Sequence, residues 1–154
     1  MKSVLNIVFI LVFIAIFGYR TFENQKFINQ KFTDFKVFGF QDWDSKYISE
    51  LKNKRILFWA TWCIPCHIQI KLLEFISSEE ELKNNYIYLS IGDSPKDIRK
   101  FLKNQNLTAP IYIDPSRMSY DYIPIKGTPT ILEIDGEKII DFSQGLSFFE
   151  FFKA

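Results

Sequence analysis

The stretch FWATWCIPCH, residues 58–67, contains both cysteines of the 154-residue chain, and they lie three positions apart. A pair with this spacing fits half of a metal site, a structural disulfide or a redox-active dithiol. A structural zinc site needs four ligands, and beside Cys63 and Cys66 the chain has a single histidine, His67. A structural disulfide here would close a very short loop and would constrain little of the unfolded chain. We therefore expect no metal site and favour the redox interpretation.

The residues around the pair predict where each sulfur lies. An apolar run over residues 56–60 predicts a buried strand, and apolar residues at helical spacing predict a helix over residues 63–77. Cys63 would then lie at the N-terminus of the helix, where unpaired N–H groups and the helix dipole stabilise a thiolate. Cys66 would lie one turn later and deeper, and Pro65 suits the first turn because it lacks an N–H group. We expect Cys63 to be the attacking nucleophile and Cys66 the resolving thiol.

Strand and helix patterns alternate along most of the chain. The hairpin signal Asp135-Gly136 joins the last two predicted strands, and Ser94 followed by Pro95 is a typical helix start. This order predicts an α/β fold with a parallel or mixed sheet flanked by helices and completed by an antiparallel hairpin. Strands are predicted over residues 32–38, 55–60, 85–92, 110–114, 128–135 and 137–142, and helices over 43–53, 63–77, 95–104, 116–122 and 146–153.

The N-terminus is strongly apolar. Residues 4–19 contain no charge, which predicts an uncleaved signal anchor near the lower length limit for crossing a bilayer. A cleaved signal peptide fits less well because residues 15–19, AIFGY, match the small-residue A-x-A pattern of a cleavage site poorly, and a buried core helix is the third alternative. Lys2 favours a cytoplasmic N-terminus and export of the rest, although Arg20 and Lys26 weaken the asymmetry. The predicted organisation is an anchor over residues 1–22, a polar tether over 23–32 and one domain over 33–154.

Composition excludes one class of partner. The chain has 19 basic and 18 acidic residues, a net charge of +1, and its lysines are interleaved with acidic residues. Nucleic-acid-binding domains normally show a basic excess on one face. We therefore expect no nucleic-acid partner.

Two motifs carry a resemblance to a known family. FWATWCIPC at residues 58–66 resembles the active-site stretch of thioredoxin-fold proteins, and GTPT at residues 127–130 resembles the cis-proline loop of that fold, with Thr128 before Pro129. With the predicted anchor and the extra segment around residues 95–114, the chain is most similar to membrane-tethered TlpA-, ResA- and DsbE-type proteins and to the suppressor-of-copper-sensitivity D type. The resemblance implies a thioredoxin-like fold, a central mixed sheet flanked by helices, and thiol–disulfide exchange without a cofactor.

The resemblance also assigns the other site residues. It implies that the Thr128-Pro129 backbone holds a protein substrate as an added strand. Trp62, Ile64 and Pro65 are expected to contact the substrate around the reactive sulfur. For Trp62 simple packing is an equal alternative, whereas Trp59, on the predicted strand, is expected in the core.

The chain departs from the family pattern at two positions. Leu57 occupies the place of a buried aspartate in thioredoxin, and Gln69 occupies the place of a glutamate in ResA- and DsbE-like proteins. Both acids are credited with helping the buried thiol to exchange its proton. His67 is expected to be an exposed helix residue, with modest electrostatic tuning of the pair as the alternative.

The residues between the cysteines bear on the direction of the reaction. Ile64 offers no hydrogen bond between the cysteines, which favours a reductase of disulfide-containing envelope proteins over a strong oxidant. A reductase in an oxidising compartment needs electrons from across the membrane, and the resemblance implies a DsbD- or CcdA-like membrane donor. The expected location is the bacterial inner membrane, with the catalytic domain on the periplasmic side. An oxidant or isomerase, and a non-catalytic binding module, are the two alternatives.

Overall fold

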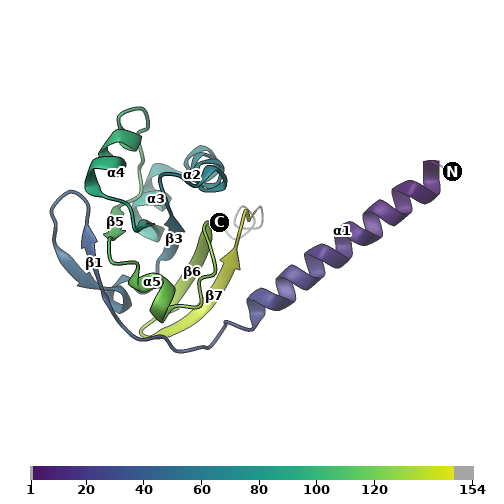
Figure 1. The fold of residues 1–154 in the computed structure, drawn as a ribbon, viewed down its shortest axis with the longest axis horizontal. Coiled ribbons are helices and arrows are strands. Elements are labelled where there is room, and N and C mark those ends of the chain that lie inside the picture. Colours follow the sequence, from purple (N-terminus) through teal and green to yellow (C-terminus); the bar gives the residue numbers. More distant parts are fainter. Residues whose placement is uncertain (1, 148–154) are drawn as a thin grey trace.

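A computed structural model describes residues 2–147 of the chain. A seven-stranded sheet, in the order β2-β1-β5-β4-β3-β6-β7, forms the centre of the domain (Figure 1). The strands are β1 (Lys36–Gly39), β2 (Ser45–Tyr47), β3 (Arg55–Trp59), β4 (Tyr86–Ile91), β5 (Ile111–Asp114), β6 (Thr130–Asp135) and β7 (Lys138–Gln144). The helices are α1 (Lys2–Gln25), the 3-10 helix η1 (Ile48–Leu51), α2 (Ile64–Ile76), α3 (Glu79–Asn85), α4 (Pro95–Leu102) and α5 (Met118–Tyr122).

The sheet is mixed, as the element order predicts. β3, β4 and β5 are parallel, whereas β6 pairs antiparallel with β3 and continues into β7. The parallel register aligns Trp59 with Ser90, and the antiparallel register aligns Phe58 with Thr130. The C-terminal ends of β3 and β4 therefore meet the N-terminal end of β6 at one edge of the sheet.

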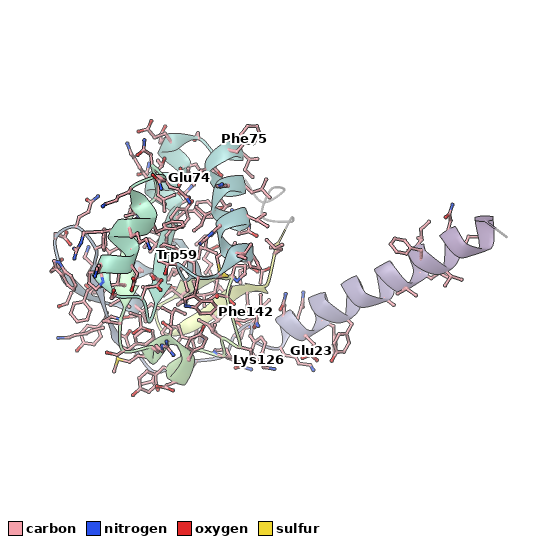
Figure 2. The ribbon with its side chains drawn as sticks, turned by 45° about the horizontal axis from the view of Figure 1, so that its top comes forward. Glu23, Trp59, Glu74, Phe75, Lys126 and Phe142 are labelled. Carbon is pink, nitrogen blue, oxygen red and sulfur yellow. A yellow bond between two sulfur atoms is a disulfide. The ribbon has the colours of Figure 1, made fainter. Side chains whose placement is uncertain are left out.

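The core lies on both faces of the central strands. Successive side chains of a strand point to opposite faces, so β3 contributes Ile56 and Phe58 to one cluster and Leu57 and Trp59 to the other. The second cluster includes both cysteines and the inner side of α2, as Figure 2 illustrates with the buried Trp59 and the exposed Phe75. Full burial of a large apolar side chain contributes about 1.5–3 kcal/mol, which explains the two-sided apolar pattern of this strand.

The predicted helix over residues 43–53 is wrong. The segment forms β2 and η1 instead, after a turn in which Asp44 N–H donates to the Asp42 carboxylate at 3.1 Å and Trp43 has a φ of 58°. An aspartate that binds nearby backbone N–H groups competes with helix formation, and spacing of apolar residues does not detect this competition.

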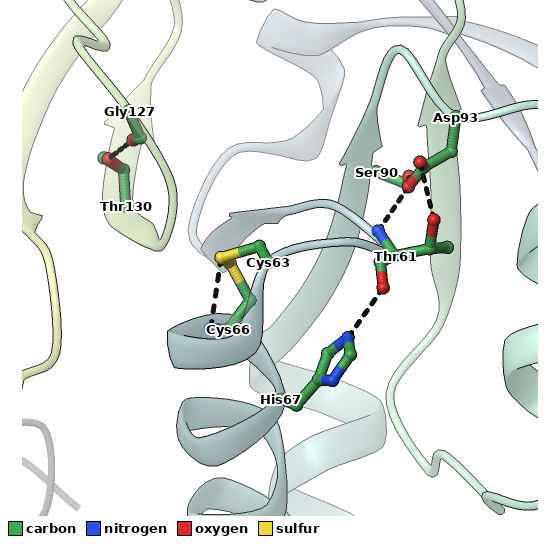
Figure 3. Close-up of a disulfide and its surroundings, with 8 residues drawn as sticks. All are labelled: Thr61, Cys63, Cys66, His67, Ser90, Asp93, Gly127 and Thr130. Carbon is green, nitrogen blue, oxygen red and sulfur yellow. Dashed lines mark hydrogen bonds between the residues drawn. A yellow bond between two sulfur atoms is a disulfide. The ribbon is translucent and has the colours of Figure 1, made fainter.

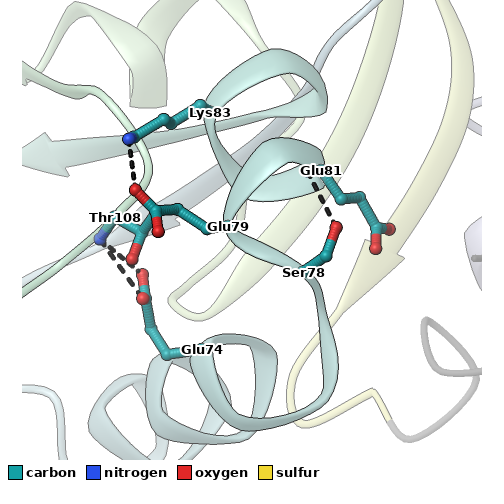
Figure 4. Close-up of polar contacts among 6 residues, drawn as sticks. All are labelled: Glu74, Ser78, Glu79, Glu81, Lys83 and Thr108. Carbon is teal, nitrogen blue, oxygen red and sulfur yellow. Dashed lines mark hydrogen bonds and ion pairs between the residues drawn. The ribbon is translucent and has the colours of Figure 1, made fainter.

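α3 was not predicted, although its start carries a helix signal. Ser78 accepts a hydrogen bond from Glu81 N–H at 3.2 Å, and three glutamates fill the first turn (Figure 4). Such an N-cap and acidic first turn stabilise a helix start. The predicted start of α4 is confirmed, since Ser94 caps it and Pro95 is its first residue. The hairpin at Asp135-Gly136 is also confirmed, and Gly136 has the positive φ that such a turn requires.

α1 extends away from the domain (Figure 1), and its described apolar side chains, such as Ile7, Phe9 and Leu11, are exposed. Among the residues that the structure describes, no helix has the length and apolar character that a membrane crossing requires. The helix itself is confirmed, but its role as a membrane span is not. The chain meets the domain just after α1, where the ring of Phe27 lies 4.6 Å from that of Phe142. The predicted helix over residues 146–153 lies mostly outside the described residues.

Candidate active site

Cys63 and Cys66 form a disulfide in the turn where β3 leads into α2 (Figure 3). The S–S distance is 2.06 Å and the Cα atoms are 5.2 Å apart. Cys63 is the N-cap of α2, and its Sγ accepts a hydrogen bond from Cys66 N–H at 3.2 Å. The predicted position of Cys63 at the helix N-terminus is therefore confirmed.

The two sulfurs have different access to the surface. Cys66 is fully buried, whereas Cys63 keeps 4% of its surface exposed. In the reduced state, a Cys63 thiolate at this position has a backbone N–H donor and the positive end of the helix dipole beside it. The arrangement suits Cys63 for attack and Cys66 for the internal step.

Two exposed apolar side chains, Trp62 and Ile64, are the sequence neighbours of Cys63. Trp62 is 67% exposed and Ile64 is 71% exposed, so neither is buried in the core. Of the two alternatives for Trp62, exposure favours the substrate rim. Trp59 is fully buried, which confirms its predicted core position. Pro65 is within the first turn of α2, where a missing N–H group leaves no helical hydrogen bond unmade.

The loop before β6 lies beside the cysteines (Figure 3). The Thr128-Pro129 peptide bond is cis, as the resemblance implies. The Thr130 hydroxyl donates to Gly127 O at 2.7 Å and closes the loop, while Pro129 O accepts from Gly145 N–H. The Thr128 hydroxyl oxygen is buried and has no hydrogen-bond partner among the described residues. Antiparallel pairing of β6 with β3 explains why a segment some sixty residues after the cysteines lies at their edge of the sheet.

Leu57 and Gln69 are both fully buried on the side of the sheet where the cysteines lie. The amide of Gln69 donates to Ser147 O at 3.2 Å and accepts from Ser147 N–H at 2.9 Å. Gln69 therefore holds the backbone of Ser147 against α2. The sequence showed the replacement of an acid at this position but not its partner, which is 78 residues away.

His67 is half-buried, so the expectation of an exposed residue is wrong. Its Nε2–H group donates to Thr61 O at 2.9 Å, and its ring lies 4.8 Å from that of Phe101. The ring contact and the hydrogen bond hold the imidazole against the turn instead of in solvent.

Three polar residues at this edge were not predicted. Asp93 is buried after β4, and its carboxylate accepts hydrogen bonds from Thr61 and from Ser90 (Figure 3). The sequence does carry a signal for this contact, because Thr61 and Asp93 follow neighbouring parallel strands and polar residues in such positions meet at the same edge of a sheet.

The AhpC/TSA family model matches residues 28–143 of the chain. The thioredoxin-like protein YneN of Bacillus subtilis (strain 168) is 32% identical over 98 residues, which are 60% of this chain and 57% of YneN. The thioredoxin of Staphylococcus aureus (strain N315) is 33% identical over 60 residues, which are 39% of this chain and 56% of that protein. The matched part thus spans a little over half the length of these relatives.

Two solved structures show the same fold. A thio-disulfide isomerase from Thermus thermophilus superposes with a TM-score of 0.64 at 16% identity, over 82% of this chain and 92% of the other. An exposed lipoprotein thioredoxin from Streptococcus pneumoniae superposes with a TM-score of 0.57 at 22% identity, over 79% and 96%. The predicted thioredoxin-like fold, with its mixed sheet flanked by helices, is confirmed.

Proposed function

The chain belongs to the AhpC/TSA family, and from this membership and the geometry of the cysteine pair we propose that it is a thiol–disulfide oxidoreductase acting on disulfide-containing proteins. The observation that carries the proposal is the position of Cys63. Its Sγ accepts a hydrogen bond from Cys66 N–H at the start of α2, and its disulfide partner Cys66 is fully buried. No cofactor is needed for this chemistry, because both electrons come from the dithiol.

In the reductive direction, the Cys63 thiolate attacks one sulfur of the substrate disulfide. A mixed disulfide forms, and the other substrate sulfur leaves as a thiolate that takes a proton from water. Cys66 then loses its proton and attacks Cys63 Sγ. This second step forms the Cys63–Cys66 disulfide and releases the remaining substrate sulfur as a thiolate, so that two electrons pass from the pair to the substrate.

The substrate would bind between the turn and the loop before β6. Trp62 and Ile64 flank Cys63 in the sequence and offer exposed apolar surface, with Pro65 the next residue. The loop between Gly127 and Thr130, which contains Thr128 and Pro129, lies beside the cysteines (Figure 3). An extended peptide at this loop would add main-chain hydrogen bonds, while the apolar rim contacts its side chains.

Reduction of envelope proteins is the proposed direction. The support is Ile64, an apolar and exposed residue that gives the Cys63 thiolate no side-chain hydrogen bond, in contrast to the polar residue found in strong oxidants. A membrane electron donor of the DsbD or CcdA type would return the pair to its reduced state.

The proposed location is the inner membrane, with the domain on the periplasmic side and α1 as a single-pass anchor. The support is the uncharged sequence of residues 4–19 and the exposure of apolar side chains such as Ile7 and Phe9. Alkaline carbonate washing of bacterial membranes is the test, followed by protease treatment of spheroplasts. Retention in the membrane and cleavage of the domain from outside are expected, and release by carbonate would contradict the anchor.

Trapping of the mixed disulfide tests the proposed activity. The full chain with Cys66→Ser should accumulate a covalent complex with insulin or with oxidised envelope proteins, because the internal step is blocked. Cys63→Ser is the matched control and should form no complex. Equal trapping by both variants, or failure of the wild-type protein to reduce insulin disulfides, would contradict the proposal.

A further inference from the structure

All three polar groups of Thr61 are held by hydrogen bonds. Its N–H group donates to Asp93 Oδ2 at 2.7 Å, and its hydroxyl donates to Asp93 Oδ1 at 2.8 Å. Its carbonyl oxygen accepts from His67 Nε2 at 2.9 Å. Thr61 lies two residues before Cys63, in the turn that connects β3 with α2, so its backbone is fixed immediately before the nucleophile (Figure 3).

The carboxylate of Asp93 is buried and hydrogen-bonded. Asp93 is only 6% exposed, and Ser90, which is fully buried, donates to Asp93 Oδ2 at 2.6 Å. Parallel pairing aligns Ser90 with Trp59, so the loop after β4 lies beside the turn after β3. A buried carboxylate is tolerated when donors surround it, and here both oxygens accept hydrogen bonds.

His67 holds the same turn from the opposite side. It belongs to the first two turns of α2, and its own N–H group donates to Cys63 O. Within the turn, Cys63 N–H donates to Ala60 O at 3.1 Å. The backbone of residues 60–63 is therefore connected to β4 through Asp93 and to α2 through His67.

We propose that Asp93, supported by Ser90, acts together with His67 as a set of positioning residues that fix Thr61 and thereby hold Cys63 in the N-cap geometry of α2. The inference rests on the proposed function, because it assigns these residues to the reactivity of the nucleophile. Their side chains bond to Thr61 or to one another, so they act on the sulfur of Cys63 through Thr61.

The direction in which loss of the Asp93 charge changes the stability of the Cys63 thiolate distinguishes positioning from a purely electrostatic effect. A negative carboxylate near the turn disfavours a second negative charge, so on electrostatic grounds alone its removal would favour the Cys63 thiolate. Positioning predicts the opposite, because a looser turn moves the sulfur away from the Cys66 N–H group and the helix dipole. Asp93→Asn also leaves the Thr61 donors facing an amide that has one acceptor oxygen instead of two.

The test is the rate at which iodoacetamide alkylates Cys63 in the reduced full chain, kept in mild detergent, over a range of pH. Every protein carries Cys66→Ser, so Cys63 is the only thiol. Asp93→Asn and Thr61→Val should lower the rate at pH 7 by about fivefold and shift the midpoint of the profile to higher pH, because the thiolate loses part of the N-terminal stabilisation. Thr61→Ser keeps the hydroxyl and should stay close to the parent rate.

Asp114→Asn is the matched control. Asp114 is also buried at the end of a strand, and its carboxylate accepts from Met118 N–H and from the N–H and hydroxyl groups of Ser119. This variant should lose stability but keep the alkylation profile. The proposal would be overturned if Asp93→Asn and Thr61→Val matched Asp114→Asn in rate, or if Asp93→Asn accelerated alkylation. Alkylation needs no protein substrate, so its outcome is independent of whether the wild-type chain reduces insulin.

Discussion

Replacement of Gln69 by glutamate should destabilise the domain in a manner that depends on pH. Gln69 is fully buried and uses its amide both to donate to Ser147 O and to accept from Ser147 N–H. In the Gln69→Glu variant, the ionised carboxylate can still accept from Ser147 N–H, but it has no proton to donate to Ser147 O.

The expected magnitude follows from these contacts. The ionised carboxylate loses one hydrogen bond and leaves two buried acceptors facing each other, which costs about 2–4 kcal/mol of unfolding free energy. Protonation restores a donor, so burial should raise the pKa of the new carboxyl above its value in the unfolded chain. The folded state then binds more protons than the unfolded state above a pH of about 4.3, and the stability of the variant should fall as pH rises through the raised pKa.

The assay is urea unfolding of the oxidised full chain in mild detergent, followed by tryptophan fluorescence at pH 5 and pH 8. The loss relative to wild type should be larger at pH 8 than at pH 5 by about 1 kcal/mol or more. Gln41→Glu, at an exposed position, is the matched control and should change stability little at either pH. Equal losses for Gln69→Glu at both pH values would contradict the role of Gln69 as a buried donor to Ser147 O.

Three further variants test separate parts of the account. Trp62→Ala should change the unfolding free energy by less than about 0.5 kcal/mol, because the side chain is exposed. The same variant should slow the reduction of insulin more than the reduction of oxidised glutathione, and equal slowing of both would argue against a protein-binding role for Trp62. Burial, and after it the neighbouring Glu74 carboxylate, raises the pKa of Tyr88, so its phenol stays protonated in the folded chain and the unfolding free energy should fall as pH rises above about 10. Tyr88→Phe should make this fall shallower in urea titrations, and an unchanged dependence on pH would contradict the expectation. Ser94→Ala removes the N-cap that accepts from Asp97 N–H and should cost about 1 kcal/mol in thermal or urea unfolding, whereas no loss would show that α4 needs no cap.

Local sequence patterns were sufficient to predict most of the strands and the position of the reactive cysteine. Apolar runs bounded by turn residues predicted β3, β4 and β5, because strands covered on both faces need apolar side chains in every position. The spacing of Cys63 and Cys66 at the start of a helical pattern was sufficient to place one sulfur at the N-cap. Residues 43–53 show the limit, since a side-chain-to-backbone turn at Asp42 overrode apolar spacing typical of a helix.

The polar contacts that support the site could not be predicted in the same way. Asp93 is hydrogen-bonded to Thr61, 32 residues away in the sequence, and Gln69 is hydrogen-bonded to Ser147, 78 residues away. Such pairs depend on strand order and register, which apolar periodicity does not determine. The same is true of Glu74, which accepts a hydrogen bond from Thr108 N–H (Figure 4). Its carboxylate also accepts from the Tyr88 hydroxyl.

The reduction potential of the Cys63–Cys66 pair decides whether the protein acts as a reductase. The measurement is equilibration of the full chain with glutathione redox buffers, read by tryptophan fluorescence or by thiol labelling of the only two cysteines. For a reductase we expect a potential well below about −230 mV, towards the thioredoxin end of the range. A potential of about −120 to −180 mV would place the protein with oxidants and isomerases and would contradict the proposed direction.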